Sequence, residues 1–402
     1  MSGAGATTAD RGCIGILSVC PHLANVPVVS AIIEKLAEAG YEVRVFAPSA
    51  PGVSPRPGAA PVVYVGNPWT WEGYGWSRPL GHRGFLRAWA LRERLRRNYR
   101  AMLMVDATAV ELAAVWAPVF RVPQLYCSLE ILVEKDLPAT AQTLRRWHGV
   151  EARLLPAYRH YILPDEVRAG VLAAEYRLDP ERMICIPNSW RNIPSKPKTG
   201  ILRRMFGLSA TDRILIYAGN IGPGFGLEEI LASVANWPEH WKLVLHSSFG
   251  AHVNSRIAFE LDLIRRLAPP GRVWLTRPDQ APVDYWDLLA DADAGIAFYT
   301  RNGDEWGWLT NNQVMGYASG KINTYLRAGL PVITNRYTNL KDMILDPEQA
   351  GVAVESAAEI AAALRQIDRE GNGLVRRARR AYENRLDPEP GLERLLAAIQ
   401  SF

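Results

Sequence analysis

Apolar positions in the first half of the chain follow two different periods. Cys13–Val19 is a short unbroken apolar run that is typical of a buried strand, whereas Val28–Ala39 has apolar residues at helical spacing. Pro27 suits the first turn of that helix, Gly40 suits its end, and Asn25 is a candidate N-cap. Further strands are expected at Tyr41–Ala47, Pro61–Val65, Ala101–Val105 and Pro123–Cys127. Strands that alternate with helices predict parallel β-α-β units.

A second alternation follows the segment Ser189–Thr199, which is rich in Pro and Lys, has no periodicity and is therefore predicted to be a linker. Strands are expected at Arg213–Ala218, Lys242–His246, Arg272–Leu275, Gly295–Tyr299 and Pro331–Thr334. Helices are expected at Leu227–Ala235, Ser255–Leu267, Asp284–Ala290, Lys321–Ala328 and Ala357–Gln366. The predicted fold class is α/β, with two doubly wound domains that face each other across a ligand-binding cleft. The predicted boundaries are residues 1–190, a linker at 191–199, a second domain at 200–385, and a final helix at 386–402 that returns to the first domain.

Composition narrows the class of protein only modestly. The 402 residues are 48% hydrophobic and 22% charged, which excludes a disordered, collagen-like or disulfide-scaffold protein. A net charge of +5 does not by itself indicate nucleic acid, but it fits a polyanionic small ligand or an anionic membrane surface. The 4 scattered cysteines predict reduced thiols. Because neither a signal peptide nor a membrane span is apparent, we expect a cytoplasmic protein, with peripheral contact at the inner face of the membrane left open.

A glycine-rich loop, Gly219–Gly226, joins a predicted strand to a predicted helix. Glycines allow backbone N–H groups to approach a phosphate, and a helix N-terminus adds positive potential. A tight turn without a ligand is the alternative. The loop lacks the G-K-[ST] of a Walker A motif, and the next strand ends at His246 without the acidic residue that a dinucleotide fold would need. The loop residues expected to contact a diphosphate are Gly219, Asn220, Gly222, Gly224 and Phe225.

A lysine opens the helix predicted further along the chain. Ser319, Gly320 and Lys321 form its first turn, and a lysine there is a suitable point charge for a diphosphate. Thr324 lies one turn on and faces the same way, so it could hydrogen-bond a ribose hydroxyl. The alternative is a lysine that only solvates the start of the helix.

Four segments, taken together and in order, resemble the donor-binding domain of GT-B glycosyltransferases, nearest to the glycosyltransferase family 4-like group. They are Ile184–Ser189, Gly219–Gly226, Val273–Ala297 and Lys321–Val332. The resemblance covers most of residues 160–370. It implies two Rossmann-like domains, a nucleotide-diphosphate sugar bound by the C-terminal domain, an acceptor bound by the N-terminal domain, and no metal or other cofactor.

The chain departs from this family in its charges. The family's diphosphate loop carries Arg and Lys, where this chain has Asn220 and Phe225. The resemblance therefore implies that Lys321, the loop N–H groups, and Arg277 or Arg301 meet the phosphate charge.

Two acidic patterns of glycosyltransferases also differ in this chain: one is absent, and the other is interpreted as structural. The family's paired glutamates fall at Gly316 and Thr324, which leaves a retaining or an inverting mechanism open. Asp291 and Asp293 spell D-x-D, a metal–nucleotide motif of a different glycosyltransferase fold. Because this pair closes a helix before a strand, we interpret it as structural.

Three residues are candidates for the base that would take a proton from an acceptor hydroxyl. Asp106 and Glu130 follow predicted strands, and His22 lies in the first strand–helix loop. The alternative for each is a role in capping or loop packing, and Asp106 is also a candidate N-cap.

Aromatic and basic segments suggest further contacts. Trp69 and Trp71 lie in a Gly-rich loop and could stack on an acceptor sugar or meet a lipid interface. Asp304 and Glu305, in a loop before the lysine helix, could contact the donor sugar. The segment Arg87–Arg100, with six arginines and one glutamate, is either a solvated helix face or an anionic-membrane contact.

The sequence thus predicts a metal-independent transferase that moves a sugar from a nucleotide-diphosphate sugar to a glycan, lipid-linked or small-molecule acceptor. No nucleic-acid partner is expected. An epimerase of nucleotide sugars and a non-catalytic nucleotide- or glycan-binding module are the alternatives. An epimerase would act on the donor alone, and a binding module would bind the donor without turnover.

Overall fold

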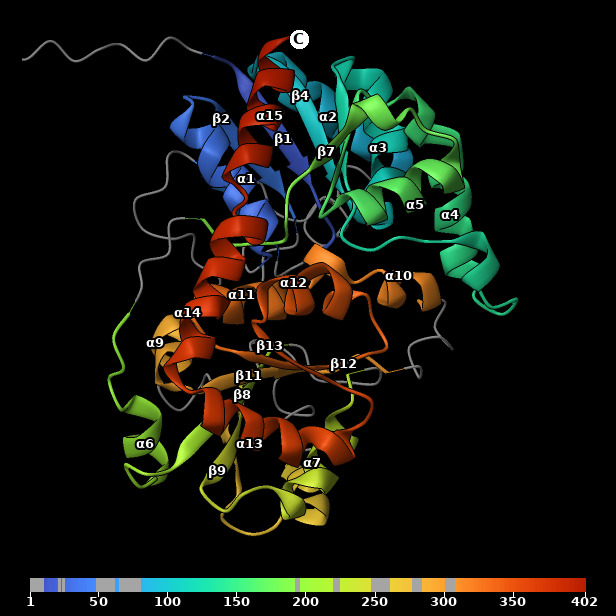
Figure 1. Cartoon of the computed structure of the whole chain (residues 1–402). Helices are drawn as coiled ribbons and strands as arrows, with labels where there is room; N and C mark the ends of the chain where they lie inside the picture. The colour runs from blue at the N-terminus through green and yellow to red at the C-terminus, as the bar shows by residue number, and fades with distance from the viewer. Residues whose placement is uncertain are drawn as a thin grey trace, which may run out of the picture. The chain divides into compact units, whose positions relative to one another are not determined.

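The computed structural model describes residues 11–20, 23, 26–47, 62–64, 81–191, 196–219, 225–246, 261–276, 284–300 and 308–402. Contacts within the chain divide it into two compact units (Figure 1). Unit 1 comprises Met1–Pro187 together with Pro388–Phe402, and unit 2 comprises Asn188–Asp387.

Unit 1 is built on a parallel seven-stranded sheet with the strand order β3-β2-β1-β4-β5-β6-β7. Its strands are β1 (Cys13–Leu17), β2 (Glu42–Phe46), β3 (Val62–Tyr64), β4 (Tyr99–Val105), β5 (Gln124–Cys127), β6 (His160–Leu163) and β7 (Met183–Cys185). Its helices are α1 (Pro27–Glu38), α2 (Gly81–Arg96), α3 (Asp106–Phe120), α4 (Gln142–Leu154), α5 (Glu166–Tyr176) and α15 (Glu389–Gln400).

Helices cover both faces of this sheet, which explains the unbroken apolar runs of its strands. Successive side chains of a strand point to opposite faces. Ile14 and Ile16 of β1 therefore join the core cluster that includes residues of α1 and α15. Cys13 and Leu17 join the cluster on the other face, with residues of α2, α3 and α5.

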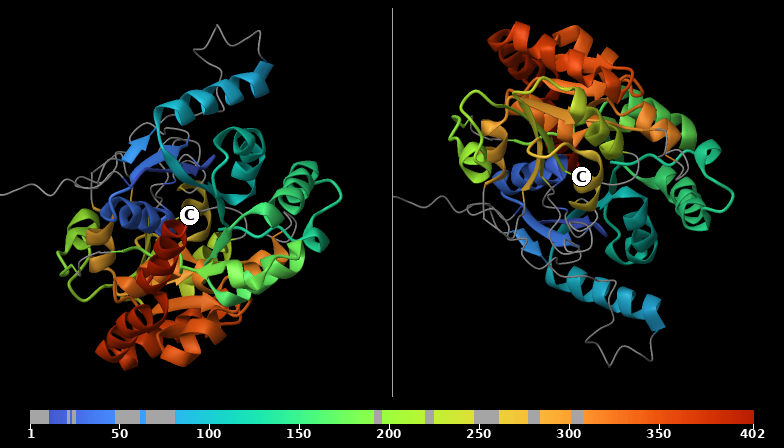
Figure 2. Two further views of the ribbon diagram at one scale, coloured as in Figure 1. Left: turned by 90° about the horizontal axis from the view of Figure 1, so that it is seen from above. Right: turned by 90° about the horizontal axis from the view of Figure 1, so that it is seen from below.

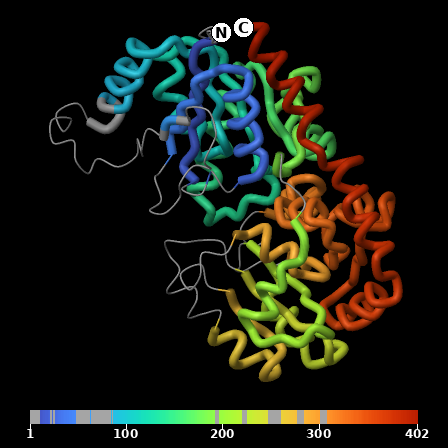
Figure 3. The backbone as a smooth tube through the Cα atoms, turned by 90° about the vertical axis from the view of Figure 1, so that its left-hand side faces the viewer, coloured from blue at the N-terminus to red at the C-terminus, as the bar shows by residue number. Residues whose placement is uncertain are grey.

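The end of the chain belongs to unit 1, and α15 packs against α1 and β7 (Figure 3). Leu392, Leu395 and Ile399 of α15 are buried. Lys35 of α1 forms ion pairs with Glu389 and Glu393 of α15. An apolar stripe and two ion pairs thus tie the last helix to a strand–helix unit at the start of the chain.

Unit 2 repeats the architecture with a parallel six-stranded sheet in the order β10-β9-β8-β11-β12-β13. Its strands are β8 (Arg213–Ala218), β9 (Trp241–His246), β10 (Val273–Thr276), β11 (Ala294–Ala297), β12 (Val332–Asn335) and β13 (Gly351–Val354). Its helices are α6 (Ile201–Phe206), α7 (Leu227–Ser233), α9 (Tyr285–Asp291), α10 (Leu309–Gln313), α11 (Gly320–Arg327), α12 (Asp346–Glu348), α13 (Ile360–Glu370) and α14 (Asn372–Ala381). Both sheets contain the order 3-2-1-4-5-6 of doubly wound dinucleotide folds, so the predicted α/β class with two doubly wound domains is confirmed.

The structure corrects the N-cap residues predicted for two helices. α1 begins at Pro27 as expected, but its N-cap is Val26, and Asn25 lies outside the described residues. Asp106 is not the N-cap of α3: Val105 takes that position, and no side chain caps the helix. The strands β6, β7 and β13 were not predicted from the apolar pattern; β7 has only three residues. The other two have only four residues each, and the three positions that open β13 are only partly buried.

Candidate functional site

The strand order of unit 2 reverses between β8 and β11, and the carboxyl ends of strands at such a switch point are where open α/β sheets bind ligands. Gly219 directly follows β8 there, with φ of +129°, and its N–H donates to the carbonyl of His246 at 2.9 Å. Gly226, with φ of +61°, precedes α7. The described ends of the glycine loop therefore both adopt backbone conformations that favour glycine.

Lys321 lies in the first turn of α11, and aromatic groups hold its ammonium at this edge. Its Nζ donates to the hydroxyl of Tyr217 at 2.8 Å. The same Nζ stands 4.1 Å from the centroid of the Phe225 ring and 4.5 Å from that of Tyr217. Cation–π contacts orient a positive charge without neutralising it. These contacts place the ammonium of Lys321 beside Gly219, where it could meet an anionic ligand.

Gly219 leaves the space that the lysine side chain fills. A Cβ at this position would lie 2.9 Å from Cε of Lys321, which is closer than real contacts allow. We expect Gly219→Ala to displace the lysine and to weaken nucleotide binding about tenfold, which corresponds to about 1.4 kcal/mol. Isothermal titration calorimetry, in which the donor nucleotide is titrated into each variant, measures this loss of affinity. Gly207→Ala is the matched control, because Gly207 also has a positive φ but has nothing near its Cβ. Equal affinity losses in both variants would contradict the expectation.

A buried hydrogen-bond network fixes the start of α11. The Ser319 hydroxyl accepts from the N–H of Ile322 at 3.3 Å and lies 2.5 Å from the hydroxyl of Tyr299. The Tyr325 hydroxyl accepts from the N–H of Ala218 at 2.7 Å, at the end of β8. The first-turn N–H groups of a helix lack intrahelical acceptors, so Gly320 and Lys321 stand where an anion would be bound. Ser319 positions this turn.

Thr324 has a different role from the predicted ribose contact. Its hydroxyl donates to the carbonyl of Gly320 at 2.6 Å and accepts from the indole N–H of Trp190 at 3.1 Å. The residue is only 3% exposed. Its side chain joins α11 to Trp190 near the start of unit 2, so the hydroxyl is already engaged inside the protein.

His246 ends β9 next to Gly219 and was not singled out as a binding residue by the sequence analysis. The Thr276 hydroxyl donates to the carbonyl of Leu245 at 3.3 Å and so accepts from Nδ1 of His246 at 2.6 Å. This assignment places the ring proton on Nδ1 and makes Nε2 an acceptor. Burial lowers the pKa of the imidazole to about 4, so the ring is neutral at physiological pH. The position of His246 at the end of a predicted strand is the sequence signal that could have identified it as a binding residue.

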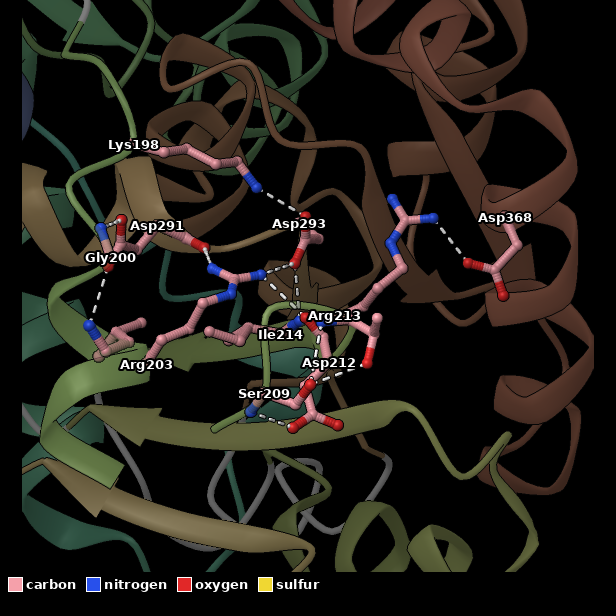
Figure 4. Close-up of polar contacts among 12 residues, drawn as sticks. Lys198, Gly200, Arg203, Ser209, Asp212, Arg213, Ile214, Asp291, Asp293 and Asp368 are labelled. Carbon is pink, nitrogen blue, oxygen red and sulfur yellow. Dashed lines mark hydrogen bonds and ion pairs between the residues drawn. The ribbon is translucent and has the colours of Figure 1, made fainter. Parts of the chain in front are cut away.

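The D-x-D pair is a structural node, in agreement with the interpretation from sequence (Figure 4). Asp291 is fully buried, and its carboxylate accepts from the N–H groups of Thr199 at 2.8 Å, Gly200 at 2.6 Å and Leu202 at 2.8 Å. Asp293 accepts from Lys198 at 2.6 Å, and also from Arg203 and the N–H of Ile214. Among the described residues, no group of three or more His, Cys, Asp or Glu side chains is arranged to hold a metal ion.

We expect Asp291→Asn to destabilise unit 2, because an amide cannot accept hydrogen bonds at its nitrogen. Losing charge-assisted bonds to buried N–H groups costs about 2–4 kcal/mol. Urea unfolding measures this loss, with Asp342→Asn as the control, because the Asp342 side chain is 79% exposed. A variant of unchanged stability that instead lost a metal-dependent thermal shift would contradict the structural role.

In unit 1, Asp106 directly follows β4, beside β1 at the switch point of this sheet. It has a φ of +63°, which is uncommon outside glycine and is tolerated best by Asp and Asn. One carboxylate oxygen accepts from the N–H of Leu129 at 2.7 Å and of Glu130 at 3.2 Å. Burial and the negative charge of Glu130 raise the pKa of Asp106 to about 7, against the opposing effects of these N–H groups and Arg168.

Glu130 and Arg168 complete the cluster around Asp106. Glu130 is exposed, whereas Asp106 is half-buried. Arg168 is fully buried and donates to the carbonyl of Leu129 at 2.7 Å, which fixes the loop that holds the aspartate. The structure thus brings two of the three predicted bases together and adds an arginine that the sequence analysis did not identify.

Several predicted residues lie outside the described part of the chain. They are His22, Trp69, Trp71, Asn220, Gly222, Gly224, Arg277, Arg301, Asp304 and Glu305. The roles assigned to them remain predictions.

Comparisons with known proteins bear on the fold of the chain. Residues 291–384 match the model of the Glucosyltransferase 3-like, C-terminal domain. No curated protein matches the chain in sequence. HepE from Anabaena, solved in complex with UDP-glucose, is similar over 98% of this chain and 100% of its own, with 15% identity and a TM-score of 0.70.

Enzymes from other bacteria have the same arrangement of elements. Sucrose-phosphate synthase from Thermosynechococcus elongatus covers 97% of this chain and 99% of its own, with 16% identity and a TM-score of 0.69. The E. coli trehalose-6-phosphate protein bound with UDP-2-fluoro glucose covers 97% and 99%, with 10% identity and a TM-score of 0.60. The chain therefore has the GT-B fold of nucleotide-sugar glycosyltransferases, as its sequence motifs predicted, and the finer assignment to family 4 stays a prediction.

Proposed function

We propose that this chain is a glycosyltransferase that moves a sugar from a nucleotide-diphosphate sugar to an acceptor hydroxyl. The observation that carries the proposal is the ammonium of Lys321, which Tyr217 and Phe225 hold beside Gly219 at the switch point of unit 2. A diphosphate there would meet a fixed positive charge and the first-turn N–H groups of α11. Both stabilise the negative charge that grows on the leaving diphosphate as the glycosidic bond breaks.

The donor is proposed to be a uridine nucleotide sugar. Support comes from similar structures whose titles name UDP-glucose, UDP, and UDP with glucose. The neutral His246 contributes an acceptor nitrogen near the phosphate edge, which suits a hydroxyl or N–H donor of a nucleoside better than another phosphate. A ligand anion would be repelled by a ring lone pair.

Unit 1 is proposed to receive the acceptor, with Asp106 as the group that takes its proton. A carboxylate whose pKa lies near 7 is suited to general-base catalysis at neutral pH. The acceptor class remains open among a glycan, a lipid-linked glycan and a small molecule. We propose that the reaction needs no divalent metal, because Lys321 supplies positive charge and hydrogen bonds occupy the D-x-D carboxylates.

The proposal is tested by incubating the chain with UDP-, GDP-, dTDP- and ADP-sugars and following release of the nucleotide diphosphate. We expect one donor to release its nucleotide slowly by hydrolysis when it is alone and faster by sugar transfer when an acceptor is present, with and without EDTA. At 100 times its Kd, the matching nucleotide should stabilise the fold by about 2.7 kcal/mol. Binding without nucleotide release would indicate a binding module, and conversion of the donor sugar without release would indicate an epimerase.

A further inference from the structure

One side of α2 packs on unit 1, and the opposite side carries exposed side chains. Trp89 stacks edge-on against Phe46 and Trp116, with ring centroids 6.1 and 5.7 Å apart. On the other side, Leu91 is 47% exposed and Leu95 is 78% exposed. They are two of the four large apolar side chains found exposed among the described residues. Both views of Figure 2 show the helix projecting from the edge of unit 1.

The charges of α2 are divided between these two sides. Glu93, the only acidic residue in Arg87–Arg100, is 6% exposed and points inward. It pairs with Arg44 at 2.9 Å and accepts from the hydroxyl of Tyr99 at 3.1 Å. The outer side therefore has no acidic residue of this segment to offset its arginines.

The outer side forms a defined surface, which we call the α2 face. Arg87, Leu91 and Leu95 are spaced by four residues, so they form one stripe along the helix. The exposed residues Arg92 and Arg96 lie next to the two leucines. Long arginine side chains can extend away from apolar neighbours and keep their charge in a polar layer. The face thus pairs apolar side chains with guanidinium groups that can reach past them.

We propose that the α2 face docks on an anionic lipid surface. Leucine side chains enter the boundary between headgroups and acyl chains, while guanidinium groups pair with lipid phosphates. Nucleic acid would account for the arginines but not for the exposed leucines, and an apolar protein partner would not account for the arginines. No helix among the described residues is long and apolar enough to cross a membrane. The inference does not depend on the proposed transferase activity.

The test is sedimentation of the full chain with vesicles of phosphatidylcholine alone or of phosphatidylcholine and phosphatidylglycerol at 7:3. We expect binding to the anionic vesicles only, weakening as salt is raised. Each arginine near an anionic surface contributes about fivefold, so Arg87→Gln/Arg92→Gln/Arg96→Gln should weaken partitioning about 100-fold. Leu91→Ser/Leu95→Ser should reduce it at least tenfold. Thermal unfolding confirms that both variants fold.

Two controls match these changes in charge and in apolar area. Arg365→Gln/Arg369→Gln/Arg376→Gln removes three exposed arginines from unit 2, and Val167→Ser/Met205→Ser removes two apolar side chains that are 43% and 39% exposed. Both should bind like the unaltered chain. The proposal is overturned by absence of binding to anionic vesicles, or by equal losses in the controls. It is also overturned if light scattering shows that the leucine variant abolishes a dimer instead of lipid binding, because the face would then be an interface between copies.

Discussion

Lys321→Ala is expected to abolish the thermal shift that the donor nucleotide produces and to lower kcat/KM by about 10²–10³. This is the range found when one preorganised charge or donor at a developing anion is removed. The ammonium of Lys321 is the positive charge that Tyr217 and Phe225 hold at the strand edge, and the described glycine-loop residues provide no second cation. Differential scanning fluorimetry with and without nucleotide, followed by steady-state kinetics, measures both effects.

The control for this variant is Lys341→Ala, which removes another lysine from unit 2. Lys341 forms ion pairs with Asp342 and Asp346 at the surface, and such pairs contribute about 0–1 kcal/mol. Its thermal shift with nucleotide should be unchanged. If Lys321→Ala retained the shift of the unaltered protein, the assignment of the diphosphate to α11 would be wrong.

Asp106→Asn is expected to lower the transfer rate at pH 8 by about 10²–10⁴, the usual contribution of a general base. Asparagine preserves the shape of the side chain, tolerates the positive φ and can still accept from the N–H groups of Leu129 and Glu130. The loss would therefore report the missing proton acceptor. Glu111→Gln is the control on the same helix, since Glu111 forms only a surface ion pair with Arg146.

The pH dependence gives this prediction a second, independent readout. With a pKa of about 7, Asp106 is ionised above neutrality, so activity should rise with pH through an inflection near 7. Because the pKa in the folded protein lies above its ordinary value of 3.8, the folded state holds an extra proton between about pH 4 and 7. Stability should then fall as pH rises through this window. Asp106→Asn cannot titrate, so its melting temperature relative to the unaltered protein should increase across the same window.

The variant Glu130→Gln distinguishes the role of Glu130 from that of Asp106 in unit 1. Its charge raises the pKa of Asp106, so removing that charge should move the inflection of the pH–rate profile to lower pH. If Glu130 were itself the base, its replacement would instead abolish activity at every pH. An inflection that stayed near 7 in a fully active variant would show that the two carboxylates are not coupled.

The periodicity of apolar residues was enough to predict the α/β class and most strands. Arg213–Ala218 was predicted as a strand and is β8, because a buried parallel strand needs a continuous apolar run. Likewise, a lysine in the first turn of a helix followed by a Gly-x-Pro end is a local pattern, and α11 has it. Gly351–Val354 is also an apolar run, but it is only four residues long and was not predicted, and it became recognisable as β13 only through its pairing with β12.

The chemistry of the two candidate sites depends on residues that are distant from each other in the sequence. Lys321 is held by Tyr217, 104 positions away, and Asp106 by the N–H of Leu129, 23 positions away. The sequence by itself determined the α/β class and which residue types stand at most strand ends, because both depend on neighbours along the chain. Only the tertiary structure decided that Thr324 bonds to Trp190, that Asp291 is fully occupied by N–H groups, and that Glu93 turns inward, because burial and hydrogen bonding depend on which elements pack together.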